Sequence, residues 1–402
     1  MVYVGVDVSK NKHDCCMIDE SGEVVASAFT IWNNKAGFDY LMEKIREVET
    51  DMKKVKVGLE ATGHYSLNIL EFLMKNEMIT YVLNPLHTNM YRKSLSLRLT
   101  KTDKVDCRTI AMMLRSDVNI RLYTKQSWLN EEMKSLTRYR FDRVQERAQL
   151  KQSIARLVNI LFPELDKLVP TIQVPSIYAL LGELPSAEKI AEAPLEKIRE
   201  ILYEASHGRY NLEKAEEIKE AAKNSIGTRI PAKSMELRHT INLIQEMNQE
   251  VCEIERDIKH LFDRMNTTIL SIPGIGYNLG AMIIAEIGDF ERFDSADKLL
   301  AYSGVSPSTY QSGMMESSYS HMEKRGSKYL RYALIEATKC VCIWDSTFAA
   351  YLAKKRGEGK HYNVAISHAA KKLVRTIYAM EKSGEKYHRN TMTGENAREK
   401  IL

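Results

Sequence analysis

Residues 2–10 read VYVGVDVSK, a continuous apolar strand that is interrupted by a single carboxylate, that of Asp7. A second run of this type, VKVGLE over residues 55–60, ends in Glu60, and a turn follows at Thr62-Gly63. A carboxylate in a buried strand is costly unless it is paired or binds a cation. These two strands therefore indicate a functional site rather than an ordinary core.

A third segment carries two more acids. Residues 101–106 read KTDKVD, so Asp103 and Asp106 lie three residues apart at the start of a helical pattern and share one helix face. Because three separate segments each deliver a carboxylate, we predict that Asp7, Glu60, Asp103 and Asp106 form a site for a hard cation. Mg²⁺ takes oxygen ligands, and a pair of such ions is the expected occupant.

The first 125 residues alternate strand and helix signals. The pattern predicts strands at 2–8, 13–18, 24–31, 55–60 and 79–83 and helices at about 35–48, 66–75 and 102–115. The order β-β-β-α-β-α-β-α is that of the α/β ribonuclease-H-like (RuvC-like) fold. In that fold the centre of the first strand, the end of the fourth strand and the last helix meet. Since the four acids fall on these three elements, we expect this fold for the N-terminal domain.

The rest of the chain reads as mostly helical. Two long helices are expected at about 128–161 and 235–265, and the second has apolar residues at coiled-coil spacing. They most simply pair with each other as an antiparallel hairpin, and pairing with another subunit is the alternative. The predicted domains are a RuvC-like metal domain at 1–125, a long helix at 126–168, a helical insert at 169–234, a long helix at 235–266 and a C-terminal domain at 267–402. No catalytic or binding role can be assigned to the insert from its sequence.

Composition and charge narrow the class of protein. The 402 residues carry a net charge of +5 and are 44% hydrophobic, as in a soluble globular protein. No apolar run approaches the roughly 18 residues of a membrane span, and the six cysteines form no CxxC pair, so we expect a cytoplasmic protein with neither a zinc site nor a disulfide framework. Residues 321–402 hold 17 basic against 8 acidic residues, and residues 86–125 hold 9 against 3. Basic blocks beside a carboxylate cluster favour a nucleic acid as partner over a merely solvated surface.

Three groups of C-terminal residues are candidates for contacts with phosphates. Residues 273–276 read PGIG between two helical patterns, as in a helix-hairpin-helix motif whose exposed amides hold a DNA phosphate; a plain tight turn is the alternative. A serine-rich loop at 301–313 is followed by a basic stretch. The candidate nucleic-acid-binding residues are Gly274, Gly276, Arg325, Lys328, Arg331, Lys354, Lys355 and Arg356.

The sequence resembles the DEDD insertion-sequence transposases, a family described as bridge-RNA-guided DNA recombinases. The resemblance covers both ends of the chain and weakens across the insert. It rests on the joint order of short motifs, which are GVDVSK at 5–10, EATGHY at 60–65, KTDKVD at 101–106, PGIG at 273–276, Gly304 with Pro307, QSG at 311–313 and KRG at 324–326 with Leu330-Arg331.

The resemblance implies a specific chemistry. Family members join a RuvC-like metal domain to a domain whose serine attacks DNA, and they exchange strands through a covalent phosphoserine link. A noncoding RNA of the element pairs with target and donor DNA. By position, the four acids match the metal ligands and Ser312 matches the nucleophile, ahead of Ser306, Ser308 and Ser317-Ser318, because it precedes Gly313. The metal site and the serine would have to meet, within one chain or across subunits, and a homo-oligomer (dimer or tetramer) in a bacterial or archaeal cytoplasm, associated with the nucleoid, is expected.

Three other readings compete with this one. A metal-dependent nuclease or Holliday-junction resolvase would use the same acids without serine chemistry. An actin-like ATPase shares the first glycine-containing strand, but the sequence has no second glycine-rich phosphate loop. A non-catalytic DNA-binding protein would not need four acids. His64 fits a hydrogen-bonded turn residue better than a metal ligand.

Overall fold

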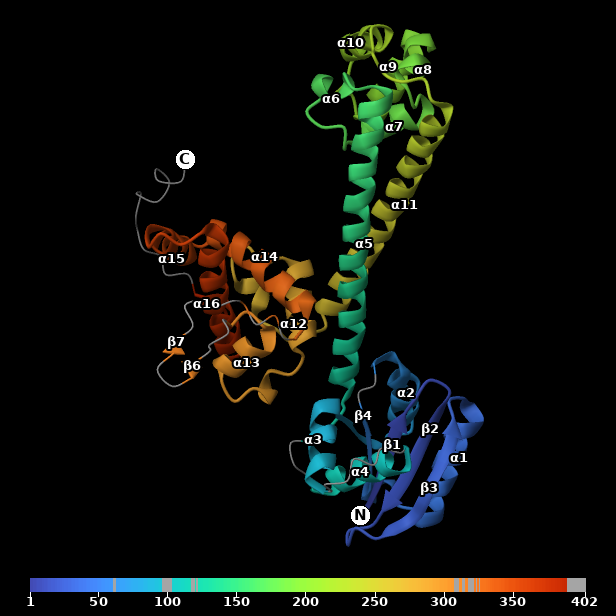
Figure 1. Ribbon diagram of the computed structural model, residues 1–402, viewed down its shortest axis with the longest axis vertical. Helices are drawn as coiled ribbons and strands as arrows, with labels where there is room; N and C mark the ends of the chain where they lie inside the picture. Colours follow the sequence, from blue (N-terminus) through green and yellow to red (C-terminus); the bar gives the residue numbers. More distant parts are fainter. Residues whose placement is uncertain are drawn as a thin grey trace. The chain divides into compact units, whose positions relative to one another are not determined.

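The computed structural model describes residues 1–60, 63–95, 103–116, 120, 122–306, 311–312, 315–316, 322, 324 and 326–388. The chain divides into two compact units, Met1–Leu129 and Asn130–Leu402 (Figure 1). Within the described ranges, no helix combines the length and the apolar character that crossing a bilayer requires.

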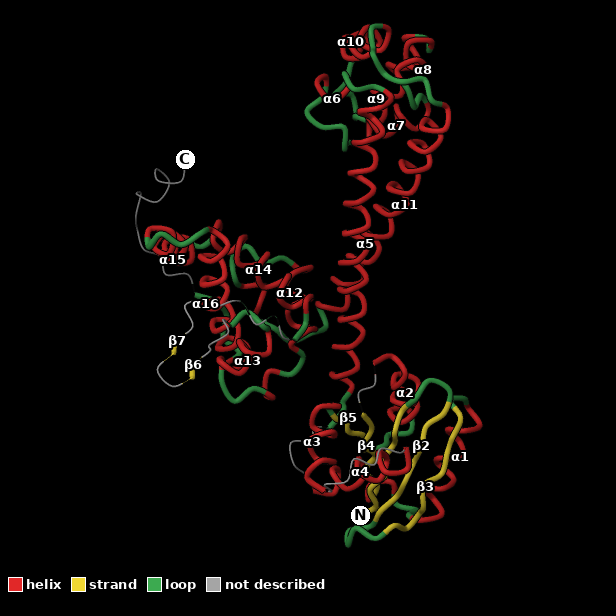
Figure 2. Tube along the Cα trace, viewed as in Figure 1, coloured by secondary structure: helices red, strands yellow, loops and turns green. Residues whose placement is uncertain are grey.

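The first unit is built on a five-stranded mixed sheet with the strand order β3-β2-β1-β4-β5 (Figure 2). Strand β1 pairs antiparallel with β2 and parallel with β4, and β5 continues the parallel part. In chain order the elements are β1 (Val2–Val8), β2 (Lys12–Ile18), β3 (Val24–Trp32), α1 (Lys35–Val48), β4 (Val55–Glu60), α2 (Leu67–Lys75), β5 (Ile79–Leu83), α3 (Pro85–Leu95) and α4 (Asp103–Ser116).

Every strand and helix expected in this unit is present, with ends that differ by at most one residue. Helix α3 was not expected, because Asn84-Pro85 reads as the end of a strand. Proline is in fact well suited to the first position of a helix, where its missing N–H has no intrahelical partner to lose. The order of elements along the chain is the expected β-β-β-α-β-α-β-α with α3 added before the last helix, while the assignment to the ribonuclease H class remains a prediction.

Helices lie on both faces of the sheet. Alternate residues of β1, Val4 and Val6, belong to a buried cluster that also includes residues of α1 and α2, such as Leu41 and Ile69. The intervening residues of β1 face α4 instead. This division follows from the period of two along a strand, which sends successive side chains to opposite faces.

Two glycines allow α4 to lie directly on the strands. Gly5 of β1 and Gly58 of β4 are paired across the parallel ladder. A Cβ atom on Gly5 would lie 2.0 Å from the carbonyl oxygen of Cys107, and one on Gly58 would lie 3.3 Å from side-chain atoms of Ile110 and Leu114. A side chain at residue 5 is therefore incompatible with the position of α4, whose backbone takes the space that the side chain would fill.

The second unit contains the predicted helical hairpin. Helix α5 (Lys125–Leu161) runs antiparallel to α11 (Pro231–Phe262) (Figure 1). As the residue number increases along α5, the number of its partner in α11 decreases. Arg140 pairs with Glu255 at 2.6 Å, Arg147 with Asn248 at 3.1 Å and Arg156 with Glu236 at 2.7 Å. Pairing of the two long helices within one chain is thus confirmed.

The insert between these helices is helical, as expected. It packs on their adjoining ends around a core that includes Phe162, Leu180, Ile198 and Ile241. Its helices are α6 (Leu165–Leu168), α7 (Pro175–Glu183), α8 (Ala187–Glu192), α9 (Leu195–Ala205) and α10 (Leu212–Lys223).

The C-terminal part is mostly helical, again as expected, and α14 packs against α12, α15 and α16. Only one 3₁₀ turn, Ile269–Ser271, lies between α11 and α12, where a helix-hairpin-helix motif would place its first helix, so that motif stays a prediction. The elements are α12 (Tyr277–Ile287), α13 (Ala296–Ser303), β6 (Gln311–Ser312), β7 (Met315–Glu316), α14 (Lys328–Trp344), α15 (Ser346–Gly357) and α16 (Tyr362–Ser383).

The contact between α4 and the sheet gives a first prediction. Gly5→Ala should lower the free energy of unfolding of the first unit by about 1–3 kcal/mol, because the methyl group forces α4 away from β1. Hydrogen exchange should show faster exchange of the α4 amides. The matched control is Gly357→Ala, since a Cβ at this helical position has no neighbour within 4 Å. Unchanged α4 exchange in Gly5→Ala would contradict the close approach.

Candidate active site

Asp7 and Glu60 lie next to each other at the ends of two parallel strands. In the ladder between β1 and β4, Val6 is paired with Leu59, and the two acids are the following residues. Adjacent parallel strands lie about 5 Å apart, and paired residues point to the same face. This is the face of Gly5 and Gly58, on which α4 lies. Both carboxylates are half-buried. The structure thus brings these two predicted acids together.

Helix α4 brings Asp106 to the same place. Glu60 and Asp106 line one cavity of about 280 Å³, together with Asn89 and Arg92 of α3. Asp103 is the first residue of α4, so it lies one turn before Asp106, but its side chain is outside the described residues. Three of the four predicted acids therefore gather where β1, β4 and the start of α4 meet, and the fourth begins that helix.

Arg92 is a site residue that the sequence reasoning missed. Its Nη1 donates to Oδ1 of Asp106 at 2.9 Å, and its Nη2 donates to Oδ1 of Asn89 at 2.9 Å. Both partners of the Arg92–Asp106 pair are largely shielded from solvent. The basic surplus of residues 86–125 pointed to this region, but only the unexpected helix α3 places one of its cations against an acid of the site.

A further acid, Asp14 of β2, was also missed. It is the direct ladder partner of Asp7 and is buried. Oγ1 of Thr30 donates to its Oδ1 at 2.6 Å, and the Lys12 ammonium lies 3.5 Å from its Oδ2. Burial raises the pKa of the neighbouring Cys15 thiol, and the carboxylates of Asp14 and Asp7 raise it further, so this cysteine stays protonated and is no nucleophile.

The acids suit a hard cation by their chemistry. Carboxylate oxygens at strand ends, with an amide oxygen from Asn89 in the same cavity, are the donors that Mg²⁺ prefers. Among the side chains that the structure describes, no three acids, histidines or cysteines stand close enough to hold a metal ion. Asp106 is instead paired with Arg92. The donor set fits a divalent ion, and the guanidinium is the cation that such an ion would have to replace at Asp106.

The serine site lies mostly outside the described residues. Ser312 belongs to the short hairpin of β6 and β7, and its side chain is not described; Arg325 is likewise outside the described residues. Lys328 begins α14, with its ammonium 4.7 Å from the Tyr329 ring centre. Nη1 of Arg331 donates to the carbonyl of Gly326 at 3.3 Å.

The two glycines of the PGIG turn have different surroundings. Gly274 has φ +89°, and a Cβ atom there would lie 2.8 Å from the Cys340 carbonyl group of α14. Gly274 is therefore required by the turn and by packing against α14. Gly276 precedes the first residue of α12, and a Cβ atom there has open space around it. Only the Gly276 side of this turn offers free access to helix-terminal amides.

The basic residues at the end of α15 are partly engaged locally. Lys355 pairs with Glu358 at 2.9 Å, and Nη1 of Arg356 donates to the carbonyl of Lys360 at 2.9 Å. Lys354 is exposed. Their role in binding nucleic acid remains a prediction.

Comparisons with known proteins identify a family of transposases. The DEDD transposase model of IS110 type matches residues 4–163, which include the three acid-bearing segments, and the model of the transposase IS116/IS110/IS902 family matches residues 266–353. Together the two matches cover more than half of the chain.

Similar proteins match over most of their length. The uncharacterized 44.8 kDa protein of insertion element IS116 from Streptomyces clavuligerus is 24% identical over 94% of each chain. The mini-circle putative transposase for IS117 from Streptomyces coelicolor is 25% identical over 78% of each chain. The pilin gene-inverting protein of Moraxella bovis is 24% identical over 94% of this chain and 95% of its own.

The pairing of Arg92 with Asp106 gives a second prediction. Arg92→Gln should tighten the binding of Mn²⁺, used as a probe for Mg²⁺, about fivefold in the absence of DNA. The reason is that a shielded ion pair of about 1 kcal/mol no longer competes for Asp106. Titration calorimetry measures the affinity. Arg115→Gln is the control, since Arg115 donates to the Glu20 carbonyl elsewhere in this unit. Equal or weaker Mn²⁺ binding by Arg92→Gln would show that the guanidinium and the metal do not compete.

Proposed function

The chain belongs to the DEDD transposase family of insertion sequences of the IS110 and IS116 type, and we propose that it is a Mg²⁺-dependent recombinase that cuts and rejoins DNA. In this proposal Asp7, Glu60, Asp103 and Asp106 hold the metal ions, and Ser312 forms a covalent link to DNA. A noncoding RNA of the element selects target and donor DNA, and the protein acts as a homo-oligomer.

One observation carries the metal part of the proposal. Asp7 and Glu60 occupy neighbouring positions on parallel strands, and α4 brings Asp106 over the same sheet face. This convergence of three chain segments supports a ribonuclease-H-like site, as does a sheet whose first three strands are antiparallel and whose remaining strands are parallel to β1. A structural core would not place several carboxylates in one half-buried location.

The residues of the site have separate tasks. Bound Mg²⁺ would polarise the scissile phosphate and steady its attacking and leaving oxygens. The carboxylates of Asp7, Glu60 and Asp106 would hold these ions and orient them. The backbone of α4 keeps Asp106 close to the two strand ends. If Asp106 held a metal ion, Arg92 would no longer be paired with it, and its guanidinium could bind a phosphate oxygen of the DNA.

The serine part rests on the family resemblance. The Ser312 hydroxyl gives its proton to solvent water, its oxygen bonds to phosphorus, and the bond from phosphorus to the leaving sugar oxygen breaks as that oxygen takes a proton from solvent. The product is a phosphodiester between serine and DNA. A sugar hydroxyl of another strand reverses the exchange and restores the serine. Because one phosphodiester replaces another, rejoining needs no external source of energy.

A metal-dependent nuclease or Holliday-junction resolvase is the second candidate. It is favoured by the fact that acids and a guanidinium line the described cavity, since such groups suffice for metal-dependent hydrolysis by water. Such an enzyme would leave free DNA ends and no protein–DNA bond. The nature of the product therefore separates the two candidates.

The metal site gives a third prediction. Asp7→Ala and Glu60→Ala should each lower strand cleavage by at least about a hundredfold, since metal-ion catalysis supplies several kcal/mol. Binding of DNA and RNA should be largely retained, and EDTA should stop the wild-type reaction. Cleavage of labelled DNA with Mg²⁺ is the assay. Glu71→Ala is the control, because Glu71 is an exposed acid of α2 that pairs with Lys75. Full recombination by Asp7→Ala would refute the metal site.

The covalent intermediate gives a fourth prediction. Wild-type protein with Mg²⁺, its RNA and matched DNA should yield a protein–DNA adduct that survives denaturant, with DNA attached at Ser312. Ser312→Ala should bind DNA and form no adduct, while the control variants Ser308→Ala and Ser317→Ala should retain it. Peptide mapping identifies the linked residue. An adduct on another serine would refute the assignment, and cleavage by Ser312→Ala would favour the nuclease.

A further inference from the structure

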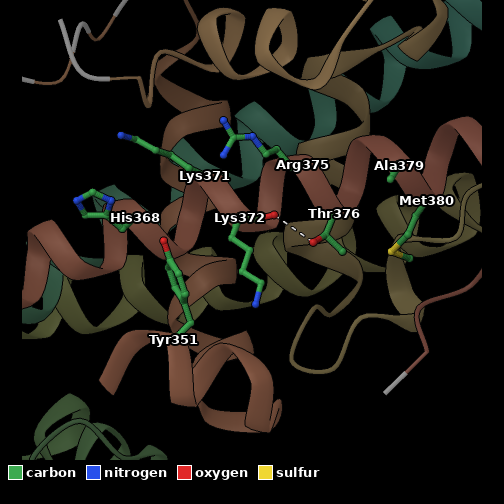
Figure 3. Close-up of a pocket in the computed structure, with 8 residues that line it drawn as sticks. All are labelled: Tyr351, His368, Lys371, Lys372, Arg375, Thr376, Ala379 and Met380. Carbon is green, nitrogen blue, oxygen red and sulfur yellow. Dashed lines mark hydrogen bonds between the residues drawn. The ribbon is translucent and has the colours of Figure 1, made fainter. Parts of the chain in front are cut away.

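A basic cavity between α15 and α16 has no part in the chemistry described so far. It has a volume of about 550 Å³ and lies open to solvent (Figure 3). Four basic side chains line it, all from α16: His368, Lys371, Lys372 and Arg375. Tyr351 of α15 forms its other wall (Figure 3). None of the residues that line this cavity is acidic.

The two lysines of this cavity are not neutralised by carboxylates in the way that other lysines of the same domain are. Lys339, Lys355 and Lys382 each pair with a glutamate within 3 Å, and each pairing raises the pKa of the lysine. Lys371 and Lys372, by contrast, have no carboxylate within ion-pair distance in the described part of the chain.

Burial and neighbouring positive charges lower the pKa values of two basic residues in this cavity. Burial lowers the pKa of Lys371, and the guanidinium of Arg375 lowers it further. Burial and the ammonium groups of Lys371, Lys360 and Lys355 lower the pKa of His368, against a smaller opposing effect of Glu358. Positive charge at this place is therefore unfavourable in the protein alone, and a bound anion would relieve it.

The cavity is also pre-organised. The ammonium of Lys372 lies 5.0 Å from the ring centre of Phe348 and 5.3 Å from that of Tyr351, so two aromatic faces hold it without neutralising it. Arg375 pairs at 2.8 Å with Asp297 of α13, and both side chains are more than half exposed. Because an exposed pair of this type is worth little, Arg375 can exchange Asp297 for a phosphate at small cost.

The spacing of the basic residues suits a chain of phosphates better than one small anion. His368, Lys371, Lys372 and Arg375 follow the i, i+3, i+4, i+7 pattern of one helix side and span a rise of roughly 10 Å. Phosphates of one nucleic-acid strand recur about every 3.4 Å along the axis of a duplex. The row covers about three such steps, so it is long enough to follow consecutive phosphates of one strand.

We propose that the cavity lined by His368, Lys371, Lys372 and Arg375 binds the phosphate backbone of a polynucleotide. The choice of a nucleic acid rests on the function proposed above, whereas the anion site itself rests on the geometry and charge of α15 and α16. The row on α16 is distinct from Lys354, Lys355 and Arg356 at the end of α15.

The salt dependence of binding tests this site without any need for cleavage. The double variant Lys371→Gln/Lys372→Gln and the wild type are titrated with labelled duplex DNA and with single-stranded RNA, in EDTA, over a range of salt concentrations. Loss of two phosphate contacts should reduce the slope of log affinity against log salt by about 1.8 for the duplex and about 1.4 for the single strand. The nucleic acid that shows the larger loss of affinity is the one that occupies the cavity.

A matched control separates this site from a general effect of charge. Lys189→Gln/Lys223→Gln also removes two ammonium groups from the second unit, but each of these exposed lysines pairs with its own glutamate on the insert. Its slope should equal that of the wild type. Equal slopes for the wild type and the Lys371/Lys372 variant, or equal losses in both double variants, would overturn the proposal.

Acylation footprinting gives a second readout on the wild-type protein, so a variant that fails to fold does not leave the site untested. Lys371, with its lowered pKa, should be acylated faster than Lys382, and the oligonucleotide should protect it. Inorganic phosphate at the same concentration of phosphate groups should not. Absent protection, or equal protection by inorganic phosphate, would overturn the proposal. Because both readouts omit Mg²⁺, a protein that binds here but never cuts DNA would refute the recombinase function alone.

Discussion

The contact of α4 with two glycines of the sheet is the constraint on which the candidate active site depends. A helix that packs on a sheet is normally separated from the sheet backbone by the side chains of both. At Gly5, however, the carbonyl of Cys107 lies where a Cβ atom would be. Asp106, the residue before Cys107, is thereby placed by backbone contact. Since a carboxylate has a short side chain, this close approach is what brings an acid of the helix near the acids of two strand ends.

A different type of interaction orders the second unit. The carboxylate of Glu286 on α12 is almost fully buried and accepts from both Nε and Nη2 of Arg138 on α5, at 2.5 and 2.9 Å. The same guanidinium lies 4.8 Å from the ring centre of Tyr329 at the start of α14. A buried ion pair adds little net stability, but a bidentate one fixes direction, because a misaligned partner leaves a charge without compensation. Arg138 thus ties α12 and α14 to the long hairpin.

Sequence patterns predicted most of this fold because its elements are locally encoded. The strands around Asp7 and Glu60 and the two long helices carry clear periodicities, and their ends were expected to within a few residues. Asp7, Glu60 and Asp106 could be predicted to lie together for the same reason, because two strand ends and the start of a helix can be recognised from the sequence. The sequence did not reveal Arg92, because α3 begins at a proline that also reads as a breaker, nor Asp14, whose place beside Asp7 depends on the register between strands.

In each of the two units, side chains of one charge gather at one place. In the first unit half-buried carboxylates lie close together and Arg92 pairs with Asp106, and in the second a row of basic residues on α16 lines a cavity whose lining residues include no acid. Each arrangement costs stability in the protein alone, because like charges repel and burial removes their hydration. On the function proposed above, a divalent ion would relieve the first and a polyanion would relieve the second. A protein that works on DNA meets both at once, so charges that destabilise the free chain become favourable where the substrate binds.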